Sequence, residues 1–242
     1  MKTIEQQTKE LEERSEILKN KWKNERFDSL KHKCFVWDGI IDYSTWFQND
    51  LKLMFLLKEA YSKDGEADWN IAIDGVAEGR GIFYVGNQAN QGMQNRIAEW
   101  AFGIESAMVG KENITIEEAL ENDREKPRQS MMKSAWVNIQ KIDGKSSSNI
   151  DNLLEVAKRD KDLLLEQLDL INPNIIFCGK TFEIIQPILF NGIKKIEETS
   201  FCYEWNDKLV VNFRHPSRAS KETLLEIFND IKKIPQKEKY RR

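Results

Sequence analysis

The sequence predicts a three-layer α/β/α fold with a central, mainly parallel, four-stranded sheet and an N-terminal helical extension. Four short apolar runs are typical of buried strands, and they lie at residues 51–57, 134–140, 174–178 and 209–213. A helical pattern or a long crossover follows each run, which is what parallel strands require. We therefore expect helices on both faces of the sheet, an extension over residues 1–48 and one domain over residues 49–242.

Composition limits the classes of protein to which the chain can belong. Charged residues make up 32% and hydrophobic residues 40% of the 242 residues, and no apolar run is long enough to cross a bilayer. The charged N-terminus does not resemble a signal peptide. Cys34, Cys178 and Cys202 are odd in number and lack paired spacing, which argues against a disulfide framework or a zinc site. We expect a cytoplasmic monomer without metal, other cofactor or membrane contact.

The distribution of charge leaves two interpretations open. The formal net charge is -3, which argues mildly against a protein that coats nucleic acid. Segments 19–33, 124–145 and 232–242 are nevertheless locally basic. They could form a basic face on an acidic protein, or they could be ordinary solvated surface.

The twelve residues from Leu209 to Ser220 combine a strand, a constrained loop and the start of a helix. Residues 209–213 are apolar with one polar interruption, and Pro216 then ends the strand. Because proline restricts the residue before it, His215 is expected in extended geometry at the carboxyl end of this strand. Ser220 is a suitable N-cap for the helix that the next apolar positions predict. Open α/β sheets bind ligands at this edge, so His215 is a candidate site residue, although a structural histidine is the alternative.

This order of strand, His215-Pro216-Ser217 and helix resembles the second signature of the uracil-DNA glycosylase superfamily. The first signature of that superfamily is a loop of the type Gly-Glu-Ala-Pro-Gly after a strand, and Glu59-Ala60 after run 51–57 is similar to it. Tyr61 stands where proline would be, and the glycine is not kept either. A surface carboxylate is the alternative for Glu59. The resemblance covers about residues 51–231.

The resemblance also implies roles for residues between the two signatures. Phe83 or Tyr84, in Ile-Phe-Tyr-Val-Gly, would stack on a flipped base, although aromatic residues in an apolar run also suit a core. Asn138 would read the polar edge of the base, because its side chain both donates and accepts hydrogen bonds. Lys141 would contact DNA near it.

In the second signature, Ser217 and Arg218 would grip the DNA backbone or fill the vacated stack. The iron-sulfur branch of the superfamily needs four cysteines, so no cluster is expected here.

Two further motifs give weaker indications of function. Gly179-Lys180-Thr181 follows a predicted strand but lacks the P-loop glycine five positions earlier, where Asn174 stands, so Gly179 is expected to serve close backbone packing. Segment 144–148 is either a flexible linker or a loop that meets a phosphate.

The activity that the resemblance implies is hydrolysis of the N-glycosidic bond of a base flipped out of double- or single-stranded DNA, leaving an abasic site. Glu59 and His215 would be catalytic. Uracil, a deaminated purine and a modified base such as those of phage genomes all remain open, with DNA repair or antiphage defence as the setting. The alternatives are a catalytically silent nucleic-acid-binding protein with the same fold and a flavodoxin-like enzyme that acts on free nucleotides.

Overall fold

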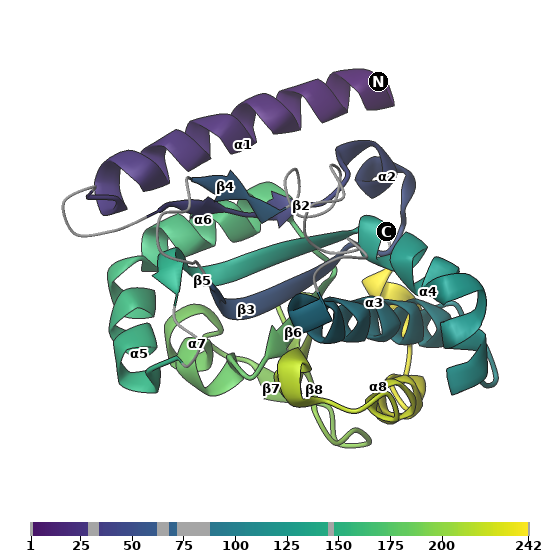
Figure 1. Ribbon diagram of the computed structural model, residues 1–242. Coiled ribbons are helices and arrows are strands. Elements are labelled where there is room, and N and C mark those ends of the chain that lie inside the picture. The colour runs from purple at the N-terminus through teal and green to yellow at the C-terminus, as the bar shows by residue number, and fades with distance from the viewer. Residues whose placement is uncertain (1, 29–33, 62–67, 72–87, 145–147, 242) are drawn as a thin grey trace.

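The structure is a computed structural model, and it describes residues 2–28, 34–61, 68–71, 88–144 and 148–241. Helices alternate with strands along the chain (Figure 1). The helices are α1 (Ile4–Arg26), α2 (Tyr43–Gln48), α3 (Gln88–Met108), α4 (Ile116–Met132), α5 (Ile150–Arg159), α6 (Lys161–Ile171), α7 (Phe182–Leu189) and α8 (Thr223–Lys232), with short 3-10 turns η2 (Pro216–Arg218) and η3 (Lys237–Tyr240). Across these ranges, no helix combines the length and the apolar character that spanning a membrane requires.

Within the described part of the chain, seven strands form the main sheet in the order β2-β5-β3-β6-β9-β8-β7. These strands are β2 (Gly39–Ile40), β3 (Leu53–Tyr61), β5 (Ser134–Gly144), β6 (Ile175–Gly179), β7 (Lys194–Lys195), β8 (Cys202–Trp205) and β9 (Lys208–Phe213). The four central strands β5, β3, β6 and β9 pair in parallel. The outer strands pair antiparallel. A separate two-stranded sheet joins β1 (Val36–Trp37) to β4 (Trp69–Asn70).

The α/β class and the four predicted strands are therefore confirmed, but the prediction of a four-stranded sheet is wrong, because short strands extend both edges. At one edge, β8 and β9 form a hairpin through Asn206 and Asp207, whose φ angles are 47° and 59°. Two consecutive positive φ angles are the geometry of the tight turn that best matches the twist of a hairpin.

Helices cover both faces of the sheet (Figure 1). Helices α3, α4 and α8 lie over the face that carries Phe55, Phe177 and Phe213, and Trp100 of α3 packs on the last two of these rings. Helices α1, α5, α6 and α7 lie over the other face. Each face is thus sealed by its own apolar cluster, as a buried parallel sheet requires.

The N-terminal helix belongs to the second of these clusters. Thr3 caps α1 in a capping box with Gln6, and Leu11, Leu18 and Trp22 are buried against the domain. Residues 1–48 also supply β2 to the sheet, so the described part of the expected extension shares its core with residues 49–242.

Two helix predictions need correction. The amphipathic pattern of residues 149–171 predicts a single helix, but the structure has two there, because Asp160 leaves the helical conformation and turns its buried carboxylate toward Arg26 and Arg159. Ser220 is not the side-chain cap of α8, because turn η2 and a further turn separate β9 from that helix. All three cysteines are buried and form no disulfide.

Candidate functional site

The order of the parallel strands indicates where a ligand would bind. From β3 the chain moves to β5 on one side, and it then returns to β6 and β9 on the other side. Open α/β sheets bind ligands beyond the carboxyl ends of the strands at such a switch point, which here lies between β3 and β6. Glu59 lies in the carboxyl-terminal part of β3 and His215 just beyond β9, whereas Asn138, expected at a strand end, lies in the middle of β5 at the level of Leu57.

Strand periodicity directs Glu59 and Asn138 toward the same face of the sheet. Leu57 and Trp136 stand two residues before them, and both belong to the cluster under α3 and α8. Since side chains alternate along a strand, Glu59 and Asn138 are directed to that face as well. Leu57 and Asn138 are register partners, so Glu59 lies two residues further along the neighbouring strand. Glu59 is half-buried, and Asn138 is 2% exposed.

His215 is held by the turn that follows β9. Its backbone is extended, with φ -72° and ψ 137°, as expected before proline. Its Nδ1 accepts the Ser217 N–H at 3.3 Å and lies 2.8 Å from Ser217 Oγ. In the tautomer in which Nδ1 accepts this N–H, a neutral ring carries its proton on Nε2 and can donate from there. Turn η2 packs against α3, on the same side as Glu59 and Asn138.

Gly179 allows the turn with His215 to lie close to the sheet. A Cβ at this position would stand 2.5 Å from Leu57 Cδ2 and 3.5 Å from Pro216 Cδ. The expectation of close backbone packing is therefore confirmed. Lys180 follows with a φ of 61°, an uncommon conformation for a residue with a side chain, and its N–H donates to the Phe213 carbonyl at 2.7 Å.

Asn138 has a buried polar group that remains to be satisfied. Within the described residues, its Nδ2 has no hydrogen-bond partner. Its backbone is instead fully engaged: its N–H donates to Asp38 Oδ2 at 2.8 Å, and its carbonyl accepts from Lys141 Nζ at 2.7 Å. An unpaired buried amide is costly, so this one indicates a missing partner such as a ligand or a water molecule.

Lys141 lies on the opposite face of β5 from Asn138. Its ammonium donates to Asp38 Oδ1 at 2.5 Å, and the two side chains are 1% and 0% exposed. Burial lowers the pKa of Lys141 and raises the pKa of Asp38, and the attraction between the two charges opposes both shifts. The expected DNA contact of Lys141 does not fit this position, because a phosphate cannot reach the ammonium.

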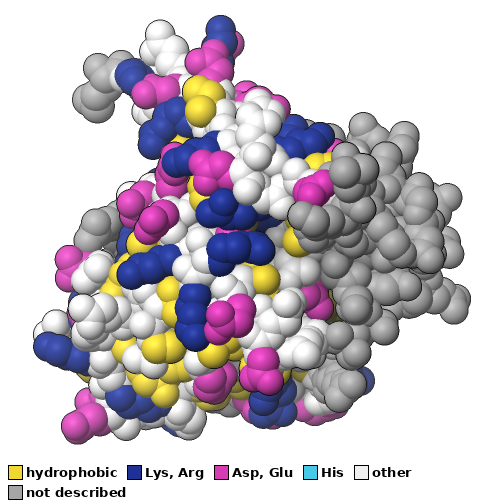
Figure 2. All heavy atoms as spheres, turned by 90° about the vertical axis from the view of Figure 1, so that its left-hand side faces the viewer, with side chains coloured by type: hydrophobic (Ala, Val, Ile, Leu, Met, Phe, Trp, Pro, Cys, Tyr) yellow, Lys and Arg dark blue, Asp and Glu magenta, His cyan; other side chains and the backbone are white. Residues whose placement is uncertain are grey.

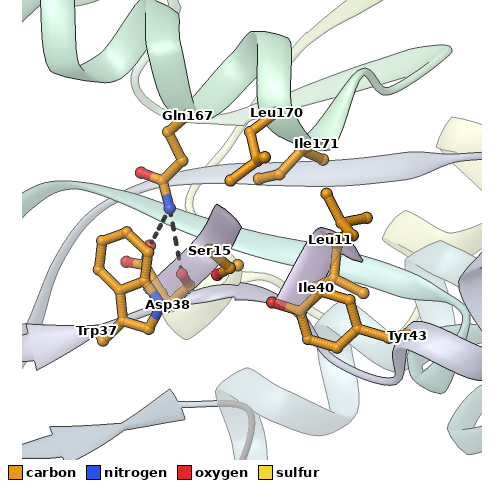
Figure 3. Close-up of a pocket in the computed structure, with 10 residues that line it drawn as sticks. Leu11, Ser15, Trp37, Asp38, Ile40, Tyr43, Gln167, Leu170 and Ile171 are labelled. Atoms are coloured by element: carbon orange, nitrogen blue, oxygen red, sulfur yellow. Dashed lines mark hydrogen bonds between the residues drawn. The ribbon is translucent and has the colours of Figure 1, made fainter. Parts of the chain in front are cut away.

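Gln167 of α6 completes this polar group. Its Nε2 lies 3.1 Å from both Asp38 O and Asp38 Oδ1 (Figure 3). The pocket drawn there, between α1, α6 and β2, has a volume of about 10 Å³. That volume holds about one water molecule, so a nucleobase cannot bind there.

An open groove of about 620 Å³ begins beside the ends of β6 and β9. Its charges balance, with Lys180, Arg214 and Lys233 against Glu183, Glu226 and Asp230. Arg214 pairs with Glu226 at 2.6 Å and Lys233 lies 3.4 Å from Asp230. Lys180 alone among the three cations has no ion-pair partner in the described part of the chain, and its side chain is exposed.

The remaining predicted residues are placed only in part. Phe83 and Tyr84 lie outside the described residues, as does most of loop 144–148. Ser217 is exposed beside His215, and Arg218 lies in η2 with its side chain outside the described part.

Around α1, the charges on the surface favour the interpretation of ordinary solvated segments over that of one basic face. Lys and Arg side chains lie among Asp and Glu side chains on the face drawn in Figure 2. In segment 19–33, several cations pair with acidic groups: Lys19 with Glu16, Lys21 with Glu166, Lys23 with Asp68, and Arg26 with Asp160.

Three residues that pattern reasoning missed or set aside are Asp38, Gln167 and Lys180. Asp38 interrupts the apolar run Phe-Val-Trp before Gly39, which is a weak signal for a buried charge. Gln167 sits within an amphipathic helix and gives no signal at all. Lys180 is conspicuous only as part of the rejected phosphate-binding motif.

Chemically, the site offers a carboxylate, a carboxamide and an imidazole that can donate from Nε2. This set can activate a water molecule, hydrogen-bond a polar heterocycle and stabilise a departing anion. Among the described residues, no group of three or more metal-binding side chains comes together. No family model matches this sequence, and neither does any of the curated proteins searched.

Proposed function

We propose that this chain is a monofunctional DNA glycosylase that hydrolyses the N-glycosidic bond of a flipped-out uracil, deaminated base or otherwise modified base. One observation carries the proposal. Glu59 and Asn138 are directed to the same face of the sheet, and the turn that carries His215 packs against α3 over that face, near the switch point between β3 and β6. The resemblance to the glycosylase signatures, at the same residues, supports it independently of the geometry.

In the proposed reaction, water adds to the sugar carbon as the base leaves with the bonding electrons. The sugar passes through a cationic, oxocarbenium-like state. Glu59 would orient the water, accept its proton and stabilise that positive charge. His215 would donate a hydrogen bond from Nε2 to the departing anionic base, as an oxyanion donor does.

Selection of the base would rest on Asn138. Its buried Nδ2 supplies a hydrogen-bond donor that a heterocycle could satisfy on entering the site. Phe83 or Tyr84 would stack on the same heterocycle, which stays a sequence-based expectation.

The phosphate backbone would be held by exposed groups around His215. Ser217 and Arg218 keep their expected role, and Lys180 takes the place of Lys141. Lys180 is exposed, belongs to the groove beside the strand ends and has no ion-pair partner among the described residues.

The test is release of free base from a panel of single- and double-stranded oligonucleotides, followed by mass spectrometry. The panel contains uracil, hypoxanthine, xanthine and hypermodified pyrimidines. A His215→Asn preparation, purified identically, controls for contaminating host glycosylases. The proposal predicts one or a few released bases and an abasic site in the remaining strand.

The other outcomes identify the alternatives. Binding to oligonucleotides without release of any base would support the silent nucleic-acid-binding protein, for which the altered loop around Tyr61 is the specific observation. Cleavage of free nucleotides in the absence of DNA would support the flavodoxin-like enzyme. Either result would refute the glycosylase.

A further inference from the structure

The buried ion pair between Asp38 and Lys141 lies directly beside the candidate base-reading residue. The side chains are 0% and 1% exposed, and Gln167 donates to Asp38 from α6. Nothing in the proposed chemistry uses these charges, because they lie on the opposite face of the sheet from Glu59.

The ion pair fills a gap between two short pairings along the edge of β5, one through β2 and one through the bridge of Phe35 to Ile142. Strand β2 pairs with β5 only through Gly39 with Trp136 and Ile40 with Ala135. The next outward-facing backbone groups of β5 are those of Asn138. Asp38 accepts from the N–H and Lys141 donates to the carbonyl, so the pair holds Asn138 where a neighbouring strand would otherwise hold it.

Helix α1 helps to keep water from this pair. Trp22 of α1 is 1% exposed, and Lys141 Nζ lies 5.3 Å from its ring centroid. Trp37 approaches the same ammonium at 5.8 Å. These distances are in the range of cation–π contacts.

Stability alone does not explain the arrangement. Burying two charges costs several kcal/mol for each ion, and apolar residues of similar volume often give equal or greater stability. A well-satisfied polar network does, however, fix a unique geometry. The group that this network fixes is the backbone of Asn138, whose side-chain Nδ2 has no hydrogen-bond partner among the described residues.

We infer that Asp38 and Lys141 are positioning residues, which hold the Asn138 carboxamide at a fixed point in the base site while α1 keeps the ion pair dry. The assignment of a base as the ligand rests on the proposed function. The mechanical part of the inference, that the ion pair holds β5 at Asn138, does not rest on the proposed function.

The test compares wild type with the double variant Asp38→Leu/Lys141→Met, which removes both charges together. A single replacement would leave one uncompensated buried charge and risks unfolding. The matched control is Glu105→Leu/Lys133→Met, because this pair, 2.8 Å apart, lies just before the amino end of the same strand. Amide hydrogen exchange of segment 134–144 and the kcat and KM of base release are measured on all three proteins.

In the first double variant, we expect exchange at the end of β5 to be at least about tenfold faster. We also expect kcat/KM to fall about a hundredfold, the scale of a displacement of about 1 Å. Of the two double variants, only the control should keep wild-type exchange in that part of the strand and wild-type kcat/KM. The Trp22→Ala variant should show part of the faster exchange and part of the loss of kcat/KM, and the Trp22→Phe variant should show neither.

The two possible failures are distinguishable. If the wild-type protein releases no base, the proposed function fails, while hydrogen exchange still reports on the ion pair. If exchange is unchanged in a folded double variant, or base release stays at the wild-type rate despite faster exchange, the positioning role is overturned. Unfolding of that double variant, with the control folded, would also overturn it, because the pair would then be structural.

Discussion

Replacing His215 with asparagine separates its proposed part in the reaction from its part in the local fold. In the structure, Nδ1 of His215 accepts the N–H of Ser217 and caps turn η2. Asparagine is a good residue for this capping position, and its carbonyl oxygen can replace Nδ1. The carboxamide of asparagine extends only as far as the Nδ1 and Cδ2 atoms of histidine, so it cannot reach the position of Nε2.

These two contacts have different energies. A lost cap costs about 1 kcal/mol, which in a domain of this size lowers the Tm by about 2–4 °C. A lost donor to a developing anion costs about 3 kcal/mol of transition-state stabilisation, or on the order of a hundredfold in rate. The His215→Asn variant should therefore keep the wild-type Tm and release base about a hundredfold more slowly. The His215→Ala variant should release base equally slowly and should also have a Tm lower by about 2–4 °C.

The assay is single-turnover release of base, with the Tm measured on the same preparation. Asn20→Ala is the control, because Asn20 is exposed on α1, which covers the other face of the sheet, and its amide lies 3.5 Å from Glu16. This control should release base at the wild-type rate. A fully active His215→Asn variant, or one that fails to fold, would refute the role given to His215.

Four further predictions test other parts of the reasoning. Glu59→Gln should fold and bind DNA but release base roughly a hundredfold more slowly, and wild-type turnover would contradict its role as general base. DNA affinity should fall steeply with salt, and Lys180→Ala should reduce the log-log slope by about 1 in every sequence; a flat salt response in wild type would argue against a nucleic-acid partner. Gly179→Ala should cost about 1–3 kcal/mol in urea unfolding, because its Cβ would meet Leu57 at 2.5 Å; an unchanged midpoint would mean that the turn moves freely. Asp207→Gly should stabilise the protein by about 0.5 kcal/mol, since φ is 59° there, and a lower Tm would show that the aspartate side chain matters more than the backbone.

The centre of the fold could be predicted from sequence, but its edges could not. The four parallel strands are buried on both faces, so each appears as a mainly apolar run. Strands β2 and β7 have two residues each and leave no periodic pattern. Hairpin β8–β9 has a local signal in Asn206-Asp207, two residues that tolerate positive φ, but the apolar run that follows predicts only a single strand. The break at Asp160 gives no such signal, because one of the two arginines that its carboxylate binds, Arg26, lies 134 positions away in the chain.

The expected DNA contact of Lys141 depends on where strand β5 ends. The sequence predicts a strand over residues 134–140 whose end presents both Asn138 and Lys141, so that both could turn toward DNA. The strand continues to Gly144, so side chains keep alternating through this stretch. Asn138 and Lys141 are three positions apart, an odd number, and must therefore face opposite sides of the sheet. The side chain of Asn138 is directed to the candidate site, and the side chain of Lys141 is therefore directed to the opposite face. From that face, the lysine ammonium donates to the backbone carbonyl of Asn138. The length of β5 is set by its pairing with β3, which extends to Tyr61 opposite Gly144, so this boundary depends on a partner strand more than 70 residues away in the chain and not on the residues of β5 alone.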